Sequence, residues 1–344
     1  MPLTAVDTAY DLLCRMWASL WWLLGAVWGA LGFTSQNWIT LTAGGTRVAV
    51  DAEPLAEGGC SFVYMARDAV SGKEYALKKV LCQTMEQKDL AEAEIRRHRA
   101  FNHPNLMPIL DWGFREAGSL GSAAYMLFPY MAGGTLRDLI NRRTLTGLIS
   151  EQEVLVIFQG VCRGVHELHS ARPPLAHRDI KADNVMLQLD GTPVLMDFGS
   201  MVPADRGKNR SEALLVQDEA AQYCTVSYRA PELFDVASSA VIDARTDVWS
   251  LGCLLYALAF GYSPFECEFT SFDQPRVVEC SFLRVIGPIT WPKKPRFSSG
   301  LCDLIKWILN QDPQQRPQVD GVLVKTDELL QQCRSTPSLI ADSV

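Results

Sequence analysis

The sequence predicts an α+β protein with two lobes, in which a small antiparallel sheet with one helix precedes a large, mainly helical lobe. Short apolar runs of strand length occupy much of residues 48–80. Helical spacing of apolar residues dominates after Gly133-Gly134. From Met16 to Thr46 there is no charged residue and no histidine, which predicts an apolar helix before the sheet. A strand-rich part followed by a helix-rich part suggests a ligand site between two lobes.

Composition narrows the class of protein. The chain has 344 residues, of which 48% are hydrophobic and 21% charged, so it can bury a large core. Its net charge is -7 and it has no long run of Lys or Arg, so we expect no nucleic-acid partner. The ten cysteines include no C-x-x-C pair and no Cys/His cluster at metal spacing. We therefore expect reduced thiols in a cytosol-facing protein.

The N-terminal segment, residues 1–46, predicts attachment to a membrane. Five of the nine tryptophans lie in the first 38 residues. An apolar helix over residues 16–33 would be about 27 Å long, just short of a bilayer core of about 30 Å. The acidic Asp7 and Asp11 disfavour a cleaved signal peptide. Three alternatives stay open: a helix that spans the membrane, one that lies on it, and a soluble helix that packs on the rest of the chain.

The elements of the first lobe follow in order. Residues 48–57 and 61–67 flank Gly58-Gly59, as two strands of a hairpin would. The chain then predicts a third strand, a charged helix and two short strands, over residues 74–80, 85–100, 107–112 and 124–128.

The second lobe shows helical periodicity. Residues 152–169 carry apolar side chains at helical spacing. Residues 187–196, interrupted at Asp190-Gly191, predict another hairpin. Residues 248–260 are almost wholly apolar and predict a helix that is buried on all sides.

The pattern His-Arg-Asp-x-Lys-x-x-Asn at residues 177–184, followed by Asp197-Phe198-Gly199, is the strongest chemical signal. Phosphoryl transfer needs a carboxylate to accept the proton of the attacking hydroxyl, oxygen ligands for Mg²⁺ and a cation beside the transferred group. Asp179 fits the base, Lys181 the cation, and Asn184 and Asp197 the metal ligands.

Two upstream motifs complete the predicted site. Lys78 on the third strand and Glu94 on the following helix suit a lysine that holds phosphates and a glutamate that orients it. The hairpin turn Ala56-Glu57-Gly58-Gly59-Cys60-Ser61 would cover the phosphates, with small residues at Ala56, Gly58 and Ser61. Taken alone, this turn could equally be an ordinary hairpin.

These motifs resemble the protein kinase superfamily over residues 50 to 332. The resemblance is closest to the Numb-associated kinase group, and within it to the myristoylated and palmitoylated serine/threonine kinases of the secretory pathway. The stretches that carry it are residues 98–105, 195–201, 222–234 and 242–253.

The resemblance implies a bilobal protein kinase fold for residues 47–332, with a C-terminal tail at 333–344. It implies ATP and Mg²⁺ as cofactors and protein Ser and Thr hydroxyls as substrates. It also implies the remaining nucleotide-binding residues: Val63, Ala76 and Met186 around the adenine, Phe128 as gatekeeper, and Pro129, Tyr130 and Met131 as hinge.

Further expectations follow from the resemblance for the second lobe. Thr225 to Glu232 would end an activation segment, Glu232 would pair with Arg316, and Asp247 would anchor the catalytic loop. Residues 209–223 consist largely of helix formers, so we expect a helix in that segment, capped by Asn209 or Ser211.

One departure from the relatives concerns location. Those kinases carry glycine after the initiator methionine, whereas Pro2 here excludes N-myristoylation. The apolar helix would replace the acyl chain and hold the enzyme at the cytosolic face of a membrane, such as the Golgi; a cytoplasmic location is the alternative. A nucleotide-binding scaffold without turnover remains the rival function, since only Gly58 occupies a motif glycine position.

Overall fold

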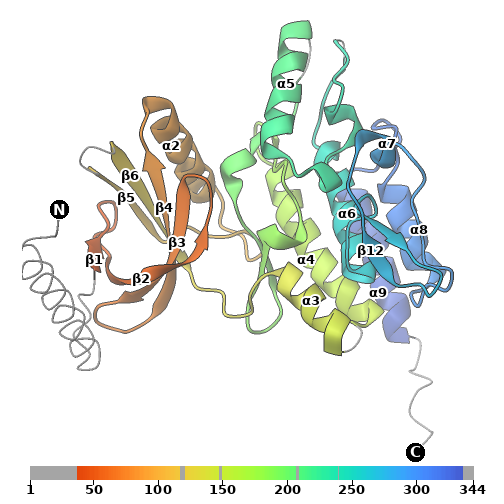
Figure 1. Cartoon of the computed structure of the whole chain (residues 1–344), viewed down its shortest axis with the longest axis horizontal. Coiled ribbons are helices and arrows are strands. Elements are labelled where there is room, and N and C mark those ends of the chain that lie inside the picture. Colours follow the sequence, from red (N-terminus) through yellow and green to blue (C-terminus); the bar gives the residue numbers. More distant parts are fainter. Residues whose placement is uncertain (1–36, 117–120, 147–148, 207–208, 239, 336–344) are drawn as a thin grey trace, which may run out of the picture. The chain divides into compact units, whose positions relative to one another are not determined.

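The computed structural model describes residues 37–116, 121–146, 149–206, 209–238 and 240–335 (Figure 1). The chain divides into two compact units, which we describe separately. In the described ranges, unit 1 comprises residues 37–83 and 110–130, and unit 2 comprises residues 84–109 and 131–335.

Unit 1 is one antiparallel sheet of six strands in the order β1-β2-β3-β4-β6-β5. Their bounds are β1 Asn37–Thr40, β2 Arg47–Glu57, β3 Ser61–Asp68, β4 Glu74–Cys82, β5 Asp111–Glu116 and β6 Ser122–Pro129. The predicted hairpin around Gly58-Gly59 and the third strand are confirmed. The strand expected at 107–112 begins only at Asp111. β1 lies in the segment before residue 47 and extends the sheet by pairing with β2.

One face of this sheet carries the core of unit 1. Its buried side chains are Leu41, Val48, Val50, Ala66, Leu77 and Leu127. The buried Asp111 fastens the turn between β1 and β2, because its carboxylate accepts the backbone N–H of Gly44 at 2.7 Å and of Thr46 at 3.0 Å. The edge strand β1 is thus held by the Asp111 side chain as well as by its backbone pairing with β2.

Unit 2 is mainly helical. Its helices are α2 Met85–Ala100, α3 Leu136–Thr146, α4 Glu151–His169, α5 Arg210–Tyr223, α6 Arg245–Phe260, α7 Phe282–Val285, α8 Ser299–Ile308 and α9 Val319–Ser335. Its short strand pairs are β7 Leu175–Ala176 with β10 Val202–Pro203, β8 Val185–Leu187 with β9 Pro193–Leu195, and β11 Cys267–Phe269 with β12 Pro275–Val277.

The centre of unit 2 is α6, which is buried from Thr246 to Ala259 as its apolar sequence predicts. Gly252 allows a close approach, since a Cβ there would lie 2.7 Å from a methyl carbon of Leu309, just after α8. The helix ends at Gly261, whose φ of 101° suits glycine.

Two findings differ from the expected organisation. The helix expected in the sheet lobe, α2, groups with the helical unit. Its last turn explains this, since Arg97 donates to the carbonyls of Phe198 and Gly199 and His98 contacts the carbonyl of Met107. The apolar helix expected over residues 16–33 lies outside the described residues. None of the helices in the described ranges combines the length and apolarity that crossing a bilayer requires.

Candidate active site

The catalytic loop of unit 2 brings Asp179 and Lys181 together, as the sequence predicts. The Nζ of Lys181 lies 2.9 Å from Asp179 Oδ2 and donates to the Thr225 hydroxyl at 2.8 Å. That hydroxyl donates to Asp179 Oδ1 at 2.6 Å, and the backbone N–H of Thr225 donates to the same oxygen at 3.1 Å. These contacts orient the carboxylate, whose side chain is 11% exposed.

Asn184 completes the surroundings of this carboxylate. Its Nδ2 donates to the backbone carbonyl and to Oδ2 of Asp179, both at 2.8 Å. A carboxylate offers about four acceptor positions. Thr225, Lys181 and Asn184 supply four contacts to the two oxygens, so Asp179 is held from both sides.

Asp247 holds the backbone that leads into this loop. Its carboxylate accepts the backbone N–H of His177 at 2.7 Å and of Arg178 at 2.9 Å, and its Oδ2 lies 3.0 Å from His169 Nε2. Burial raises the pKa of Asp247, but the hydrogen bonds and the nearby imidazoles outweigh it, so the pKa lies below its ordinary value of 3.8. The predicted anchoring role of Asp247 therefore has a direct structural basis.

Asn184 and Asp197 lie beside each other at the open end of the β8–β9 hairpin. Val185 pairs with Leu195, and the N–H of Met196 donates to the Asn184 carbonyl at 2.9 Å. Asp197 has a left-handed backbone with φ 64°, and its side chain is exposed. Since Nδ2 of Asn184 is turned toward Asp179, its Oδ1 points away from that residue and offers an oxygen ligand.

This donor set suits Mg²⁺, which binds through one or two protein oxygens and keeps waters or phosphates as its other ligands. Within the described part of the chain, no group of three His, Cys, Asp or Glu side chains could hold a metal unaided. A metal at Asn184 and Asp197 would therefore need further ligands from its nucleotide.

Glu94 lies in α2 and is 7% exposed. A Cβ placed on Gly199 would be 4.0 Å from Glu94 Oε2 and 3.3 Å from Asp197 Oδ1. The Arg97 guanidinium holds the carbonyls of Phe198 and Gly199, each at 3.0 Å. The hydrogen bonds of Arg97 hold α2 against the Asp197-Phe198-Gly199 segment, and Glu94 lies close to Gly199.

Unit 1 places the other predicted residues on one face of its sheet. Directly opposite residues of an antiparallel pair share a face, as do alternate residues of a strand. Val63 is opposite both Ala56 and Lys78, and Ala76, two residues before Lys78, is opposite Phe128. These five positions therefore share the face opposite Leu77 and the unit 1 core.

The turn and hinge residues are placed as follows. The hairpin turn after Glu57 closes through a hydrogen bond from the Gly58 N–H to the Ser61 carbonyl at 2.7 Å. Pro129 ends β6, and Tyr130 follows it as the last residue of unit 1.

In unit 2, Met186 on β8 bridges to Thr135. The N–H of Gly134 donates to the carbonyl of Met131 at 3.2 Å. This turn places the expected hinge residue Met131 close to the strand that carries Met186.

The segment between Asp197 and Pro231 contains the predicted helix, α5. Asn209 caps it by accepting the Glu212 N–H at 3.0 Å, and Ser211 lies inside the helix. At its C-terminal end Arg229 donates to the carbonyl of Cys224 at 2.8 Å, next to Thr225. The C-terminal end of α5 therefore lies directly before Thr225, the residue whose hydroxyl orients Asp179.

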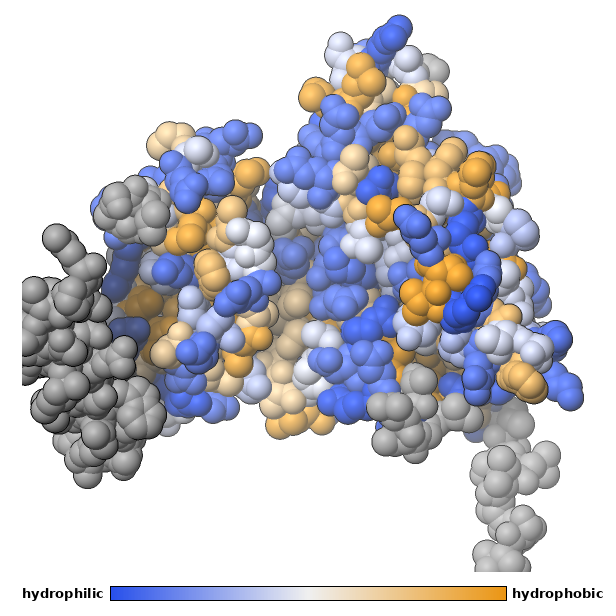
Figure 2. All heavy atoms as spheres, viewed as in Figure 1, coloured by the Kyte–Doolittle hydropathy of each residue, from blue (hydrophilic) through white to orange (hydrophobic). Residues whose placement is uncertain are grey.

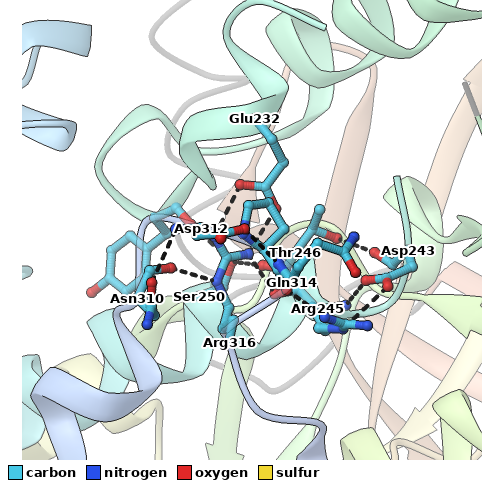
Figure 3. A network of polar contacts seen from close by, with 11 residues as sticks. Glu232, Asp243, Arg245, Thr246, Ser250, Asn310, Asp312, Gln314 and Arg316 are labelled. Carbon is cyan, nitrogen blue, oxygen red and sulfur yellow. Dashed lines mark hydrogen bonds and ion pairs between the residues drawn. The ribbon is translucent and has the colours of Figure 1, made fainter. Parts of the chain in front are cut away.

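Glu232 and Arg316 form the predicted ion pair (Figure 3). The guanidinium donates two hydrogen bonds to the carboxylate, at 2.6 and 3.0 Å, and two more to the carbonyls of Arg245 and Asn310. The Arg316 side chain is fully buried. This network fixes the end of the segment against α6 and the loop before α9.

Sequence reasoning placed Thr225 only as part of the activation segment and assigned no individual role to Thr225 or Arg97. Thr225 supplies the hydroxyl that joins Lys181 to Asp179. The signal in the sequence that could have indicated this role is the hydroxyl of Thr225 itself, which stands between Cys224 and Val226. Arg97 is one of several charged residues of α2, and its target is about 100 residues away, which no local pattern indicates.

Comparison with known proteins agrees with this geometry. The model of the protein kinase domain matches residues 50–326. Serine/threonine-protein kinase 16 of Homo sapiens and that of Rattus norvegicus are each 40% identical over 279 residues, covering 80% of this chain and 88% of theirs. Serine/threonine-protein kinase ENV7 of Saccharomyces cerevisiae is 31% identical, covering 78% of this chain and 88% of its own. The chain therefore belongs to the protein kinase family, among its serine/threonine protein kinases.

Proposed function

We propose that this protein transfers the γ-phosphate of ATP to Ser and Thr hydroxyls of other proteins, with Asp179 as the catalytic base. The observation that supports this most strongly is the carboxylate of Asp179, oriented by Thr225, Lys181 and Asn184 at 2.6 to 3.1 Å. A base that must receive a proton from a hydroxyl needs such a fixed direction.

Lys181 has two tasks in this proposal. In the structure its ammonium is shared between Asp179 and Thr225. Because the described contacts fill the acceptor positions of Asp179, the substrate hydroxyl needs one of them to be released. Lys181 releases Oδ2 when it turns toward the transferred phosphoryl group, whose charge it then stabilises.

The family implies ATP and a divalent cation. We assign the cation to Asn184 and Asp197; when bound, Mg²⁺ neutralises phosphate charge. Lys78 would hold the phosphates and Glu94 would orient Lys78. The shared face of Ala56, Val63, Ala76 and Phe128 would receive the nucleotide. In unit 1, the phosphates would lie at Glu57, Gly58 and Ser61, and the adenine would lie at Pro129 and Tyr130. In unit 2, the residues proposed for the adenine are Met131 and Met186.

The activity is tested with the full chain, Mg-ATP labelled at the γ-phosphate and a generic protein substrate, followed by phosphoamino-acid analysis. We expect phosphoserine and phosphothreonine, and loss of transfer when EDTA removes the metal. Absence of transfer to itself and to the substrate would contradict the proposal. Label on tyrosine alone would contradict the proposed substrate class.

For location, we propose that residues 16–33 attach the enzyme to a membrane of the secretory pathway. The support is the sequence between Met16 and Thr46, which has no charged residue and no histidine. Fractionation of the full chain tests this against a variant with Leu20, Leu23 and Leu24 changed to Glu. We expect only the original chain in the membrane fraction. Recovery of both proteins in the soluble fraction would refute the anchor, whereas resistance of the original to carbonate extraction would indicate that it spans the bilayer.

A further inference from the structure

Unit 2 contains a cavity that none of the proposed catalytic or nucleotide-binding residues lines. It has a volume of about 290 Å³ and lies among α3, the C-terminal end of α6, Ile149 two residues before α4, the β11–β12 hairpin and residues 292–296. This volume is close to the lower limit for small-molecule pockets, about 300 Å³.

The floor of the cavity is apolar. It includes Ile140, Ile149, Leu258 and Ala259, which are 2 to 6% exposed. Phe260 and Phe269 add aromatic surface. Burying a hydrocarbon chain on such a floor is favourable in proportion to the apolar area removed from water.

The rim is cationic, in contrast to the net charge of -7 of the chain. Arg143, Lys294 and Arg296 line the cavity and are exposed, whereas Asp273 is the only acidic side chain among the described residues that line it. The Asp273 carboxylate is already engaged, since it accepts the backbone N–H groups of Lys293 at 2.7 Å and of Lys294 at 3.2 Å. Arg143 is already paired with Glu153, whose carboxylate oxygen lies 3.4 Å from its guanidinium, so the rim offers Lys294 and Arg296 to an anion, beside one occupied carboxylate.

We infer that this cavity binds a fatty acid, with the hydrocarbon chain on the floor and the carboxylate at Lys294 and Arg296. Among the described side chains that line it there is no Asn, Gln, Ser or Thr, so these side chains offer a peptide backbone few replacements for its hydrogen bonds to water. Asp273 at the same rim disfavours a doubly charged phosphate head more than a singly charged carboxylate.

The test measures binding of laurate to the full-length kinase by equilibrium dialysis below the micellar concentration. Dodecanol, with the same chain and no charge, should bind at least about tenfold more weakly, equivalent to about 1.4 kcal/mol. Changing Lys294 and Arg296 together to Glu should weaken laurate binding at least about tenfold. The matched control changes Lys325 and Arg334, two exposed cations of α9 outside the cavity, to Glu.

A second variant, Ala259→Phe, places a ring in the floor and should abolish laurate binding while the far-ultraviolet circular dichroism stays unchanged. If it does not fold, the exposed Lys294/Arg296 variant decides alone. Failure of laurate to bind the original chain overturns the inference. So does equal binding to the original and the Lys294/Arg296 variant, which would indicate another apolar surface such as residues 16–33. Phosphate transfer plays no part in this readout, so the proposed catalytic function stands or falls separately.

Discussion

Removing Glu232 should leave the buried Arg316 without its counter-ion and destabilise unit 2. In the folded protein the guanidinium makes two charge-assisted hydrogen bonds to the carboxylate, at 2.6 and 3.0 Å. Its bonds to the carbonyls of Asn310 and Arg245, at 3.0 and 2.9 Å, remain after the change (Figure 3). Glu232→Ala thus keeps part of the network and loses the charge compensation.

The expected cost follows from burial. Breaking a buried ion pair by removal of one partner costs about 3–5 kcal/mol. Because two carbonyl contacts remain, we expect Glu232→Ala to lower the free energy of unfolding by about 3 kcal/mol. The double variant Glu232→Ala/Arg316→Met no longer buries an unpaired charge and should cost less than the sum of the single changes.

The assay is urea unfolding followed by circular dichroism. Asp303→Ala provides the control, because the Lys306–Asp303 pair has a similar distance of 3.0 Å but side chains that are 56% and 69% exposed. An exposed pair contributes about 1 kcal/mol or less. If Glu232→Ala and Asp303→Ala have the same small effect, the ion pair is not the anchor that we describe.

Three further perturbations test separate parts of the site. Thr225→Val should lower kcat roughly tenfold or more through loss of the hydroxyl between Lys181 and Asp179, whereas Thr225→Ser should retain most activity; equal rates for the two variants would contradict this. The lowered pKa of Asp247 stabilises the fold above pH 3.8, and this contribution is lost as the pH falls through the folded-state pKa. The difference in unfolding free energy between the original and Asp247→Asn should therefore shrink below pH 3.8, and a constant difference would refute the linkage. Asn209→Ala should lower the stability of α5 by about 1 kcal/mol, because it removes the side chain that caps the helix. The measurement is amide hydrogen exchange in α5, which should become faster; unchanged exchange would contradict the capping role.

Sequence patterns predicted most elements because their signals are local. Each signal depends on residues of a single element or turn. Examples are the turn at Gly58-Gly59, the apolar run of α6 and the helix-forming residues of α5. The assignment of α2 to a unit was not predictable in this way. It depends on contacts such as Arg97 with Phe198, which are distant in sequence.

The faces of α5 show a second limit. Its amphipathic signal is weak, and Leu214 and Leu215 are natural candidates for an inward face. In the structure they are 53% and 56% exposed, and Ala213, Val216 and Ala220 are buried instead. Figure 2 shows apolar side chains over this helix. Small side chains let α5 pack closely against the rest of unit 2. The hydrophobicity of the residues alone does not indicate that these small side chains form the buried face.

Within the site, motif spacing predicted which residues the catalytic loop brings together, including Asp179, Lys181 and Asn184. It did not predict how completely Asp179 is bonded, because that depends on Thr225, which is 46 residues away along the chain. In the proposed mechanism, this carboxylate therefore has to exchange a partner before it receives a substrate hydroxyl.

The most direct test of the proposed mechanism compares Asp179→Asn with Asp183→Asn in the full chain. Both changes remove one negative charge from the same loop, but the Asp183 side chain is 53% exposed and lies 3.8 Å from Arg137, away from the contacts that orient Asp179. ATP affinity and γ-phosphate transfer are measured for both. We predict that Asp179→Asn binds ATP like the original and loses transfer by at least about a hundredfold, as expected for loss of general-base catalysis. Asp183→Asn should retain transfer; equal transfer by the two variants would contradict the role of Asp179 as the base.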